Sequence, residues 1–201
     1  MPDFTTKLSP VTTQEVCETL VAAAQFVTGV AQTFADWTRL FRQTPNQFPA
    51  IDQAMFQKGG GAKDIYYAHA YWQLAPDEAW VIDVTPPDCY YWNFQLDNWW
   101  MESLDYRFRQ ITVNKHSART APDGSVRIVC AARAPGGKAA NANWIDTCDH
   151  REGTALLPGC GACGRLRRPG SAAWFRSCWP IGQSPGPQGS PGFAAATTGG
   201  A

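Results

Sequence analysis

The sequence predicts a mostly β protein: an antiparallel, jelly-roll-like β-sandwich that follows an N-terminal amphipathic helix and precedes a disordered C-terminal tail. Apolar residues recur every three or four positions over residues 12–43, and they alternate with polar residues between 64 and 131. The first spacing is typical of an amphipathic helix and the second of half-buried strands. Residues 158–201 are dominated by Gly, Ala, Pro and Arg. Such a segment buries too little apolar surface to compensate the entropy lost on ordering.

The N-terminal helix is expected over residues 12–43, within a helical segment and linker that covers 1–59. Thr12 followed by Glu15 is a capping-box pattern, and Thr44-Pro45-Asn46 ends the helix. We interpret it as a packing helix without chemistry of its own. Its apolar face consists of Val16, Leu20, Ala23, Val27, Val30, Phe34, Trp37 and Phe41.

Short strands separated by Pro-rich and Asp-Gly turns indicate a β-sandwich domain over residues 60–157. In the third strand, Trp92 and Phe94 share one face with Tyr90 and Leu96, whereas Tyr91, Asn93 and Gln95 lie on the other. Up to Phe108 the apolar residues occupy even positions, and from Ile111 they occupy odd ones. This switch from one face of the strand to the other predicts a β-bulge near Arg109-Gln110. The expected strands are 64–74, 78–85, 90–96, 106–113 and 125–131.

The composition excludes several classes of function. With 17 basic and 17 acidic residues, the chain has no net charge to hold nucleic acid or an anionic membrane surface. No apolar run is long enough to span a bilayer and no signal peptide opens the chain, so we expect a cytoplasmic protein with reduced cysteines. Cys160-Gly-Ala-Cys163 lacks two further metal ligands. We therefore expect no metal site, and nothing in the sequence indicates a cofactor.

Residues 90–116 are the candidate functional region, because aromatic side chains alternate there with amides and acids. Two interpretations remain open: a concave pocket for a small polar-aromatic or sugar-like ligand, or a core of large residues whose acids bind the backbone and arginines. His69, between two tyrosines, is expected to be structural. The candidate ligand-binding residues are Tyr91, Asn93, Gln95, Asn98, Arg107, Asn114 and Asp146. The candidate catalytic residues, as acids or bases, are Glu102, Asp105, His116 and His150.

Six motifs in order over about residues 60–157 resemble the bacterial domain-of-unknown-function 1214 family. They include YYWNFQLDN, WMESLDYR, VNKHSA, PDGSVRIV and NWIDTCDHREGT. The resemblance implies a jelly-roll-like sandwich, and the family has no established activity. The chain departs from the family pattern at 131–136, where a His and an Asp are missing. It departs again after residue 157, where a final strand would follow, and family members are longer upstream.

The missing strand would leave a sheet edge open, and we expect self-association through that edge or a need for another segment there. A frame shift would explain the tail. For function, the alternatives are a domain that binds or processes a small ligand, a non-catalytic interaction or assembly domain, and a non-functional truncated family member. The sequence does not decide whether the protein is an enzyme.

Overall fold

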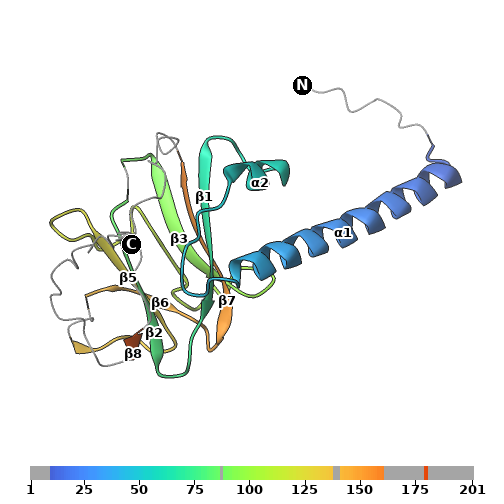
Figure 1. Ribbon diagram of the computed structural model, residues 1–201. Coiled ribbons are helices and arrows are strands. Elements are labelled where there is room, and N and C mark those ends of the chain that lie inside the picture. The colour runs from blue at the N-terminus through green and yellow to red at the C-terminus, as the bar shows by residue number, and fades with distance from the viewer. Residues whose placement is uncertain (1–9, 87, 138–140, 161–178, 181–201) are drawn as a thin grey trace, which may run out of the picture.

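Two four-stranded sheets form a β-sandwich, and one long helix projects from it (Figure 1). The computed structural model describes residues 10–86, 88–137, 141–160 and 179–180. The predicted mostly β architecture with an N-terminal helix is confirmed, whereas the predicted disordered tail lies outside the described residues except for 158–160 and 179–180. The helices are α1 (Thr13–Phe41) and α2 (Gln53–Lys58). The strands are β1 (Ile65–Gln73), β2 (Glu78–Val84), β3 (Tyr91–Asp97), β4 (Thr112–Asn114), β5 (Val126–Ala131), β6 (Asn143–Asp146), β7 (Glu152–Cys160) and β8 (Trp179–Pro180).

The core lies between the two sheets. The first sheet has the order β1-β7-β3-β4 and the second the order β6-β5-β2-β8. Trp92 and Phe94 of β3 point into this core with Trp72 of β1 and Trp80 of β2, and each of these side chains is at most 6% exposed. The predicted inward face of β3 is therefore correct for Trp92, Phe94 and Leu96. Tyr90 precedes the strand and is 84% exposed.

Strand β7 lies in the middle of the first sheet and was not predicted. It pairs antiparallel with β1 on one side and with β3 on the other. The predicted domain boundary at 157 therefore falls inside a strand, which continues to Cys160. The ladder between β7 and β3 is interrupted between the Trp92–Gly159 and Gln95–Leu156 pairs. Pro158 lies in that gap, where its missing N–H removes a hydrogen bond that a central strand would otherwise make.

The predicted strand 106–113 was wrong for most of its length. Only its last two residues, Thr112 and Val113, belong to a strand, β4, and residues 106–111 form a turn and loop, so there is no bulge at Arg109-Gln110. The aromatic side chains that suggested a buried face there, Tyr106 and Phe108, are 70% and 82% exposed. The second sheet is mixed and not purely antiparallel, because β6 pairs parallel with β5.

Helix α1 begins at the predicted capping box, in which the Thr12 side chain and the Glu15 side chain each accept a backbone N–H. Only its last turns contact the sandwich. Phe41 is fully buried and stacks on His69 of β1 at 5.1 Å, and Trp37 packs edge-on against Phe56 of α2 at 5.4 Å. The helix thus packs on the domain through its last turns alone, since its first two thirds extend away from the sandwich (Figure 1).

Candidate functional site

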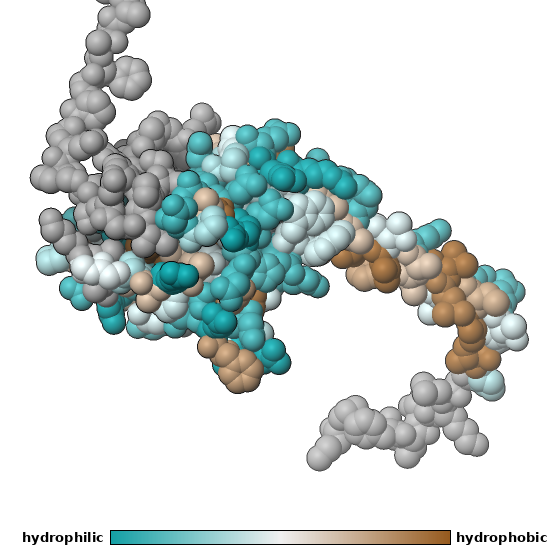
Figure 2. Space-filling model, turned by 90° about the horizontal axis from the view of Figure 1, so that it is seen from below, coloured by the Kyte–Doolittle hydropathy of each residue, from teal (hydrophilic) through white to brown (hydrophobic). Residues whose placement is uncertain are grey.

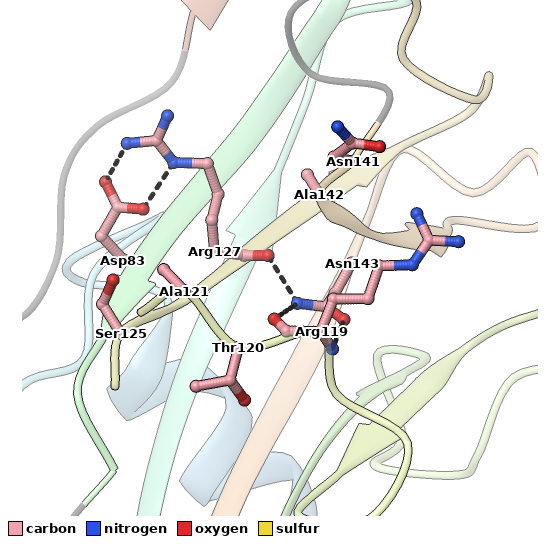
Figure 3. A pocket seen from close by; sticks show the side chains of 9 residues that line it. All are labelled: Asp83, Arg119, Thr120, Ala121, Ser125, Arg127, Asn141, Ala142 and Asn143. Atoms are coloured by element: carbon pink, nitrogen blue, oxygen red, sulfur yellow. Dashed lines mark hydrogen bonds and ion pairs between the residues drawn. The ribbon is translucent and has the colours of Figure 1, made fainter. Parts of the chain in front are cut away.

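A polar cavity of about 830 Å³ opens on the side of the second sheet that faces away from the core (Figure 3). Three segments that are distant in sequence form it: the end of β2, the loop and start of β5 over 119–127, and residues 141–143 at the start of β6. None of the residues predicted to bind a ligand belongs to it. Its lining consists of Asp83, Arg119, Thr120, Ala121, Ser125, Arg127, Asn141, Ala142 and Asn143.

One wall of the cavity carries a two-point ion pair. Asp83 and Arg127 are direct partners on β2 and β5, so their side chains emerge next to each other. The guanidinium donates from Nε to Asp83 Oδ1 at 2.6 Å and from Nη2 to Oδ2 at 2.8 Å. The adjacent carboxylate raises the pKa of Arg127, which therefore stays charged. An ion pair this exposed adds little stability, so its main effect is to fix the orientation of both groups.

The buried Asn143 side chain holds the other wall in place. Its Nδ2 donates to the backbone oxygens of Arg119 at 3.0 Å and Arg127 at 2.9 Å, and its Oδ1 accepts the Arg119 N–H at 2.7 Å. These three bonds fasten the 119–121 segment to β5. The Arg119 side chain then lies on the opposite side of the cavity from the Asp83–Arg127 pair (Figure 3).

The lining residues can bind a ligand but offer little for catalysis. Two guanidinium groups, two hydroxyls and an amide can supply hydrogen bonds, and Asp83 pairs with Arg127. Guanidinium groups match carboxylate and phosphate oxygens and do not lose their proton near neutral pH. None of the nine lining residues is a histidine or a cysteine. The site is therefore suited to hold a small anionic, hydroxyl-bearing molecule.

The predicted ligand-binding and catalytic residues fall in separate places. At the start of β3, the rings of Tyr91 and His116 lie 6.2 Å apart, and Asn114 Oδ1 accepts the backbone N–H of His116. Asn93 pairs with Asn114 across β3 and β4, and its buried Oδ1 has no hydrogen-bond partner among the described residues.

The other end of β3 holds a second group of predicted residues, roughly 20 Å away along the strand. There Asn98 Nδ2 donates to Glu102 at 2.7 Å, and Arg107 Nε donates to Asp105 at 3.0 Å. Glu102 and Asp105 thus serve local turns, and His116 lies at the opposite end of the strand. The four predicted catalytic residues do not form one site.

Asp146 and His150 belong to a tight turn after β6. Asp146 is 3% exposed, binds the Arg109 guanidinium at 2.9 Å and accepts the Cys148 N–H at 2.8 Å. Cys148 and Asp149 both have a left-handed backbone, with φ of 51° and 64°, which costs energy for residues other than glycine. Asp146 therefore holds a strained turn in place. His150 is exposed next to it.

Two buried ionisable groups on the outer face of the first sheet were not among the predicted site residues. Burial raises the pKa of Asp97 to about 7, although the Gln95 amide donates to it at 2.8 Å. Burial lowers the pKa of His69 to about 4, between the rings of Phe41 and Phe56. The alternation that placed Asn93 and Gln95 on this face, continued by one step, identifies Asp97 as well.

The described residues contain no cluster of three or more His, Cys, Asp or Glu side chains that could hold a metal ion. No helix in the same part of the chain is both long and apolar enough to cross a membrane.

The chain is similar to a protein of known structure. An uncharacterised protein from Burkholderia cenocepacia is 48% identical, with a TM-score of 0.73, over 78% of this chain and 42% of its own. The chain therefore spans less than half the length of that protein. A Vibrio parahaemolyticus protein matches at 10% identity and a TM-score of 0.44, over 86% of this chain and 47% of its own. No protein-family model and no curated protein matches the chain.

Proposed function

We propose that this chain is a ligand-binding domain for a small, hydroxyl-bearing carboxylate, such as a sugar acid, held between Arg119 and Arg127. The observation that carries the proposal is the pair of guanidinium groups on opposite sides of a cavity whose backbone is fastened by a buried asparagine. The role is binding without catalysis, because the lining residues offer no nucleophile with an adjacent base.

The chemistry of the lining favours an anionic ligand. Arg119 and Arg127 both present guanidinium groups, whose N–H donors match the oxygens of a carboxylate. The hydroxyls of Thr120 and Ser125 and the Asn141 amide line the same cavity and can exchange hydrogen bonds with ligand hydroxyls.

Family and location belong to the same proposal. Six motifs in the same order support membership of the domain-of-unknown-function 1214 family, with its jelly-roll connectivity. A cytoplasmic location, as expected from the sequence, is part of the same proposal. The aromatic region around Tyr91 and His116, half-exposed at the start of β3, is the place for a non-catalytic protein contact if the cavity binds nothing.

Isothermal titration with glucuronate, glucose and acetate tests the proposal. We expect glucuronate to bind more tightly than either glucose or acetate, because only it offers both a carboxylate and hydroxyls. Arg119→Gln should weaken glucuronate binding about tenfold or more, the effect of losing one charge-assisted hydrogen bond. Arg133→Gln, an exposed arginine outside the cavity, is the matched control. Absence of glucuronate binding, or equal affinity of the Arg119→Gln variant, would overturn the proposal.

A further inference from the structure

The projecting part of α1 carries an uncovered apolar stripe. Leu20, Val27 and Phe26 are 65%, 66% and 70% exposed, and Val16 is 46% exposed. Figure 2 shows hydrophobic side chains gathered along this helix where it leaves the sandwich. Isolated exposed apolar side chains are ordinary, but a continuous stripe of them marks a contact surface.

The stripe follows the spacing of a coiled-coil seam. From Val16 to Phe41 its members are separated alternately by four and three residues, so the average period is 3.5. Such a period keeps one line of side chains facing a second helix along its length, whereas a helix that covers a sheet needs no such regularity. The occupant that fits the stripe is therefore another helix. The seam positions are Val16, Leu20, Ala23, Val27, Val30, Phe34, Trp37 and Phe41.

The residues beside the seam carry no charge. Cys17, Ala24 and Ala31 flank it on one side, and Thr19, Phe26 and Thr33 on the other. The charged side chains of the helix, such as Glu18 and Arg39, lie away from the seam. Charged flanking residues set partner choice and orientation through attraction or repulsion between the two helices. Without them, two identical helices meet with no like-charge repulsion beside the seam.

From these observations we propose that α1 pairs antiparallel with α1 of a second copy of this chain. Trp37 and Phe41, the last seam positions, already contact the sandwich, so the sandwich lies on the seam side of the helix. In a parallel pair both sandwiches would lie at the same end of two helices only about 8–10 Å apart, and they would collide. An antiparallel pair places them at opposite ends.

The uncovered part of the seam also defines the register. Its first member, Val16, must lie opposite the last uncovered one, Phe34, of the other copy. Each residue i then faces residue 50 − i. This register places every seam residue opposite another seam residue, in the layers Val16–Phe34, Leu20–Val30 and Ala23–Val27, each repeated by symmetry. Large residues meet smaller ones, as close packing requires.

Light scattering coupled to gel filtration tests the pairing. The full chain, of 22.0 kDa, should elute with about twice that mass. Val27→Glu should raise the dimer dissociation constant at least 100-fold, because it places a carboxylate in the middle of the seam. Gln25→Glu adds the same charge on the opposite side of the helix and should leave the dimer intact. Both side chains are exposed, so neither change should alter the unfolding temperature of the sandwich.

Cross-linking tests the orientation. In a background with Cys17 and the three cysteines beyond residue 159 replaced by serine, a short bismaleimide should join Ala24→Cys to its counterpart. Ala31→Cys should not react, because the antiparallel register separates the two copies of residue 31 by 12 residues, or roughly 18 Å. A monomer, a dimer that survives Val27→Glu, or equal cross-linking at both positions would overturn the proposal. A Val27→Glu dimer would instead favour association through a sheet edge.

Discussion

Asp97 and His69 should give this protein two opposing pH dependences of stability, and Asp97→Asn should separate them. Both side chains are at most 5% exposed on the outer face of the first sheet. Burial favours the neutral form of each, which raises the pKa of Asp97 to about 7 and lowers that of His69 to about 4. Asparagine keeps the oxygen that accepts the Gln95 hydrogen bond but cannot ionise.

The magnitudes follow from linkage. An unfolded aspartate ionises near 3.8, so folded Asp97 retains a proton between pH 4 and 7 that the unfolded chain has released. Its contribution to stability is complete below pH 3.8 and about 4 kcal/mol smaller above pH 7. His69 acts in the opposite direction, because only the unfolded chain takes up its proton between about pH 6.5 and 4. Its contribution is complete above pH 6.5 and about 3 kcal/mol smaller below pH 4.

Urea unfolding at a series of pH values from 4 to 8 measures both effects. The stability gained by Asp97→Asn should grow by about 4 kcal/mol between pH 4 and pH 8 and remain constant above pH 7. The variant itself should then gain stability from pH 4 to 6.5, where the His69 effect is no longer offset. His69→Phe, which preserves the stack with Phe41 and Phe56, should show the opposite slope. A stability difference between Asp97→Asn and the parent chain that does not change with pH would refute the reasoning.

Three further predictions concern packing and can be measured by thermal or urea unfolding. Trp92→Ala should lower the free energy of unfolding by about 3–5 kcal/mol, because Trp92 is buried in the core. Tyr91→Ala, on the half-exposed face, should lower it clearly less. Equal losses would mean that β3 is covered equally on both faces. Gly153→Ala should destabilise by about 1–3 kcal/mol, because the added Cβ would overlap the backbone oxygen of Asp97. Gly29→Ala has open space around it and should stabilise the helix by up to about 1 kcal/mol. Similar effects of the two changes would contradict this packing. Arg109→Gln should lower the unfolding temperature, because it leaves the buried Asp146 carboxylate without its cation. Arg107→Gln, which breaks an exposed ion pair with Asp105, should leave the unfolding temperature unchanged. An unchanged unfolding temperature for Arg109→Gln would show that Asp146 does not need its partner.

Local signals account for what could be predicted of the fold. The capping box at Thr12 and Glu15 and the regular apolar spacing define α1, and the period of two between turns identifies β1, β2, β3 and β5. Strand β7 was missed because Gly153, Pro158 and Gly159 are typical of a loop. The predicted strand over 106–113 failed because alternating aromatic side chains indicate a strand only when one face is buried.

The candidate site could not be predicted, because it depends on which strands are neighbours. Asp83, Arg119 and Asn143 come from three segments, and no local pattern links them. The predicted residues cluster by sequence around β3, yet the length of that strand keeps His116 far from Glu102 and Asp105. Asp97 was within reach of the sequence, since it continues the alternation of Asn93 and Gln95.

The place of β7 has a consequence for synthesis of the protein. A ribosome releases β1 and β3 well before β7, although β7 is the strand that joins them. The paired strands β2 and β5 are both available once residue 131 has emerged, so the second sheet can begin to form first. Until residue 160 has emerged, the first sheet is incomplete, so Trp72 and Phe94 cannot pack into the core against the second sheet. The nascent chain then exposes large aromatic side chains. Chaperones that bind such segments would therefore act on the nascent chain before β7 has emerged.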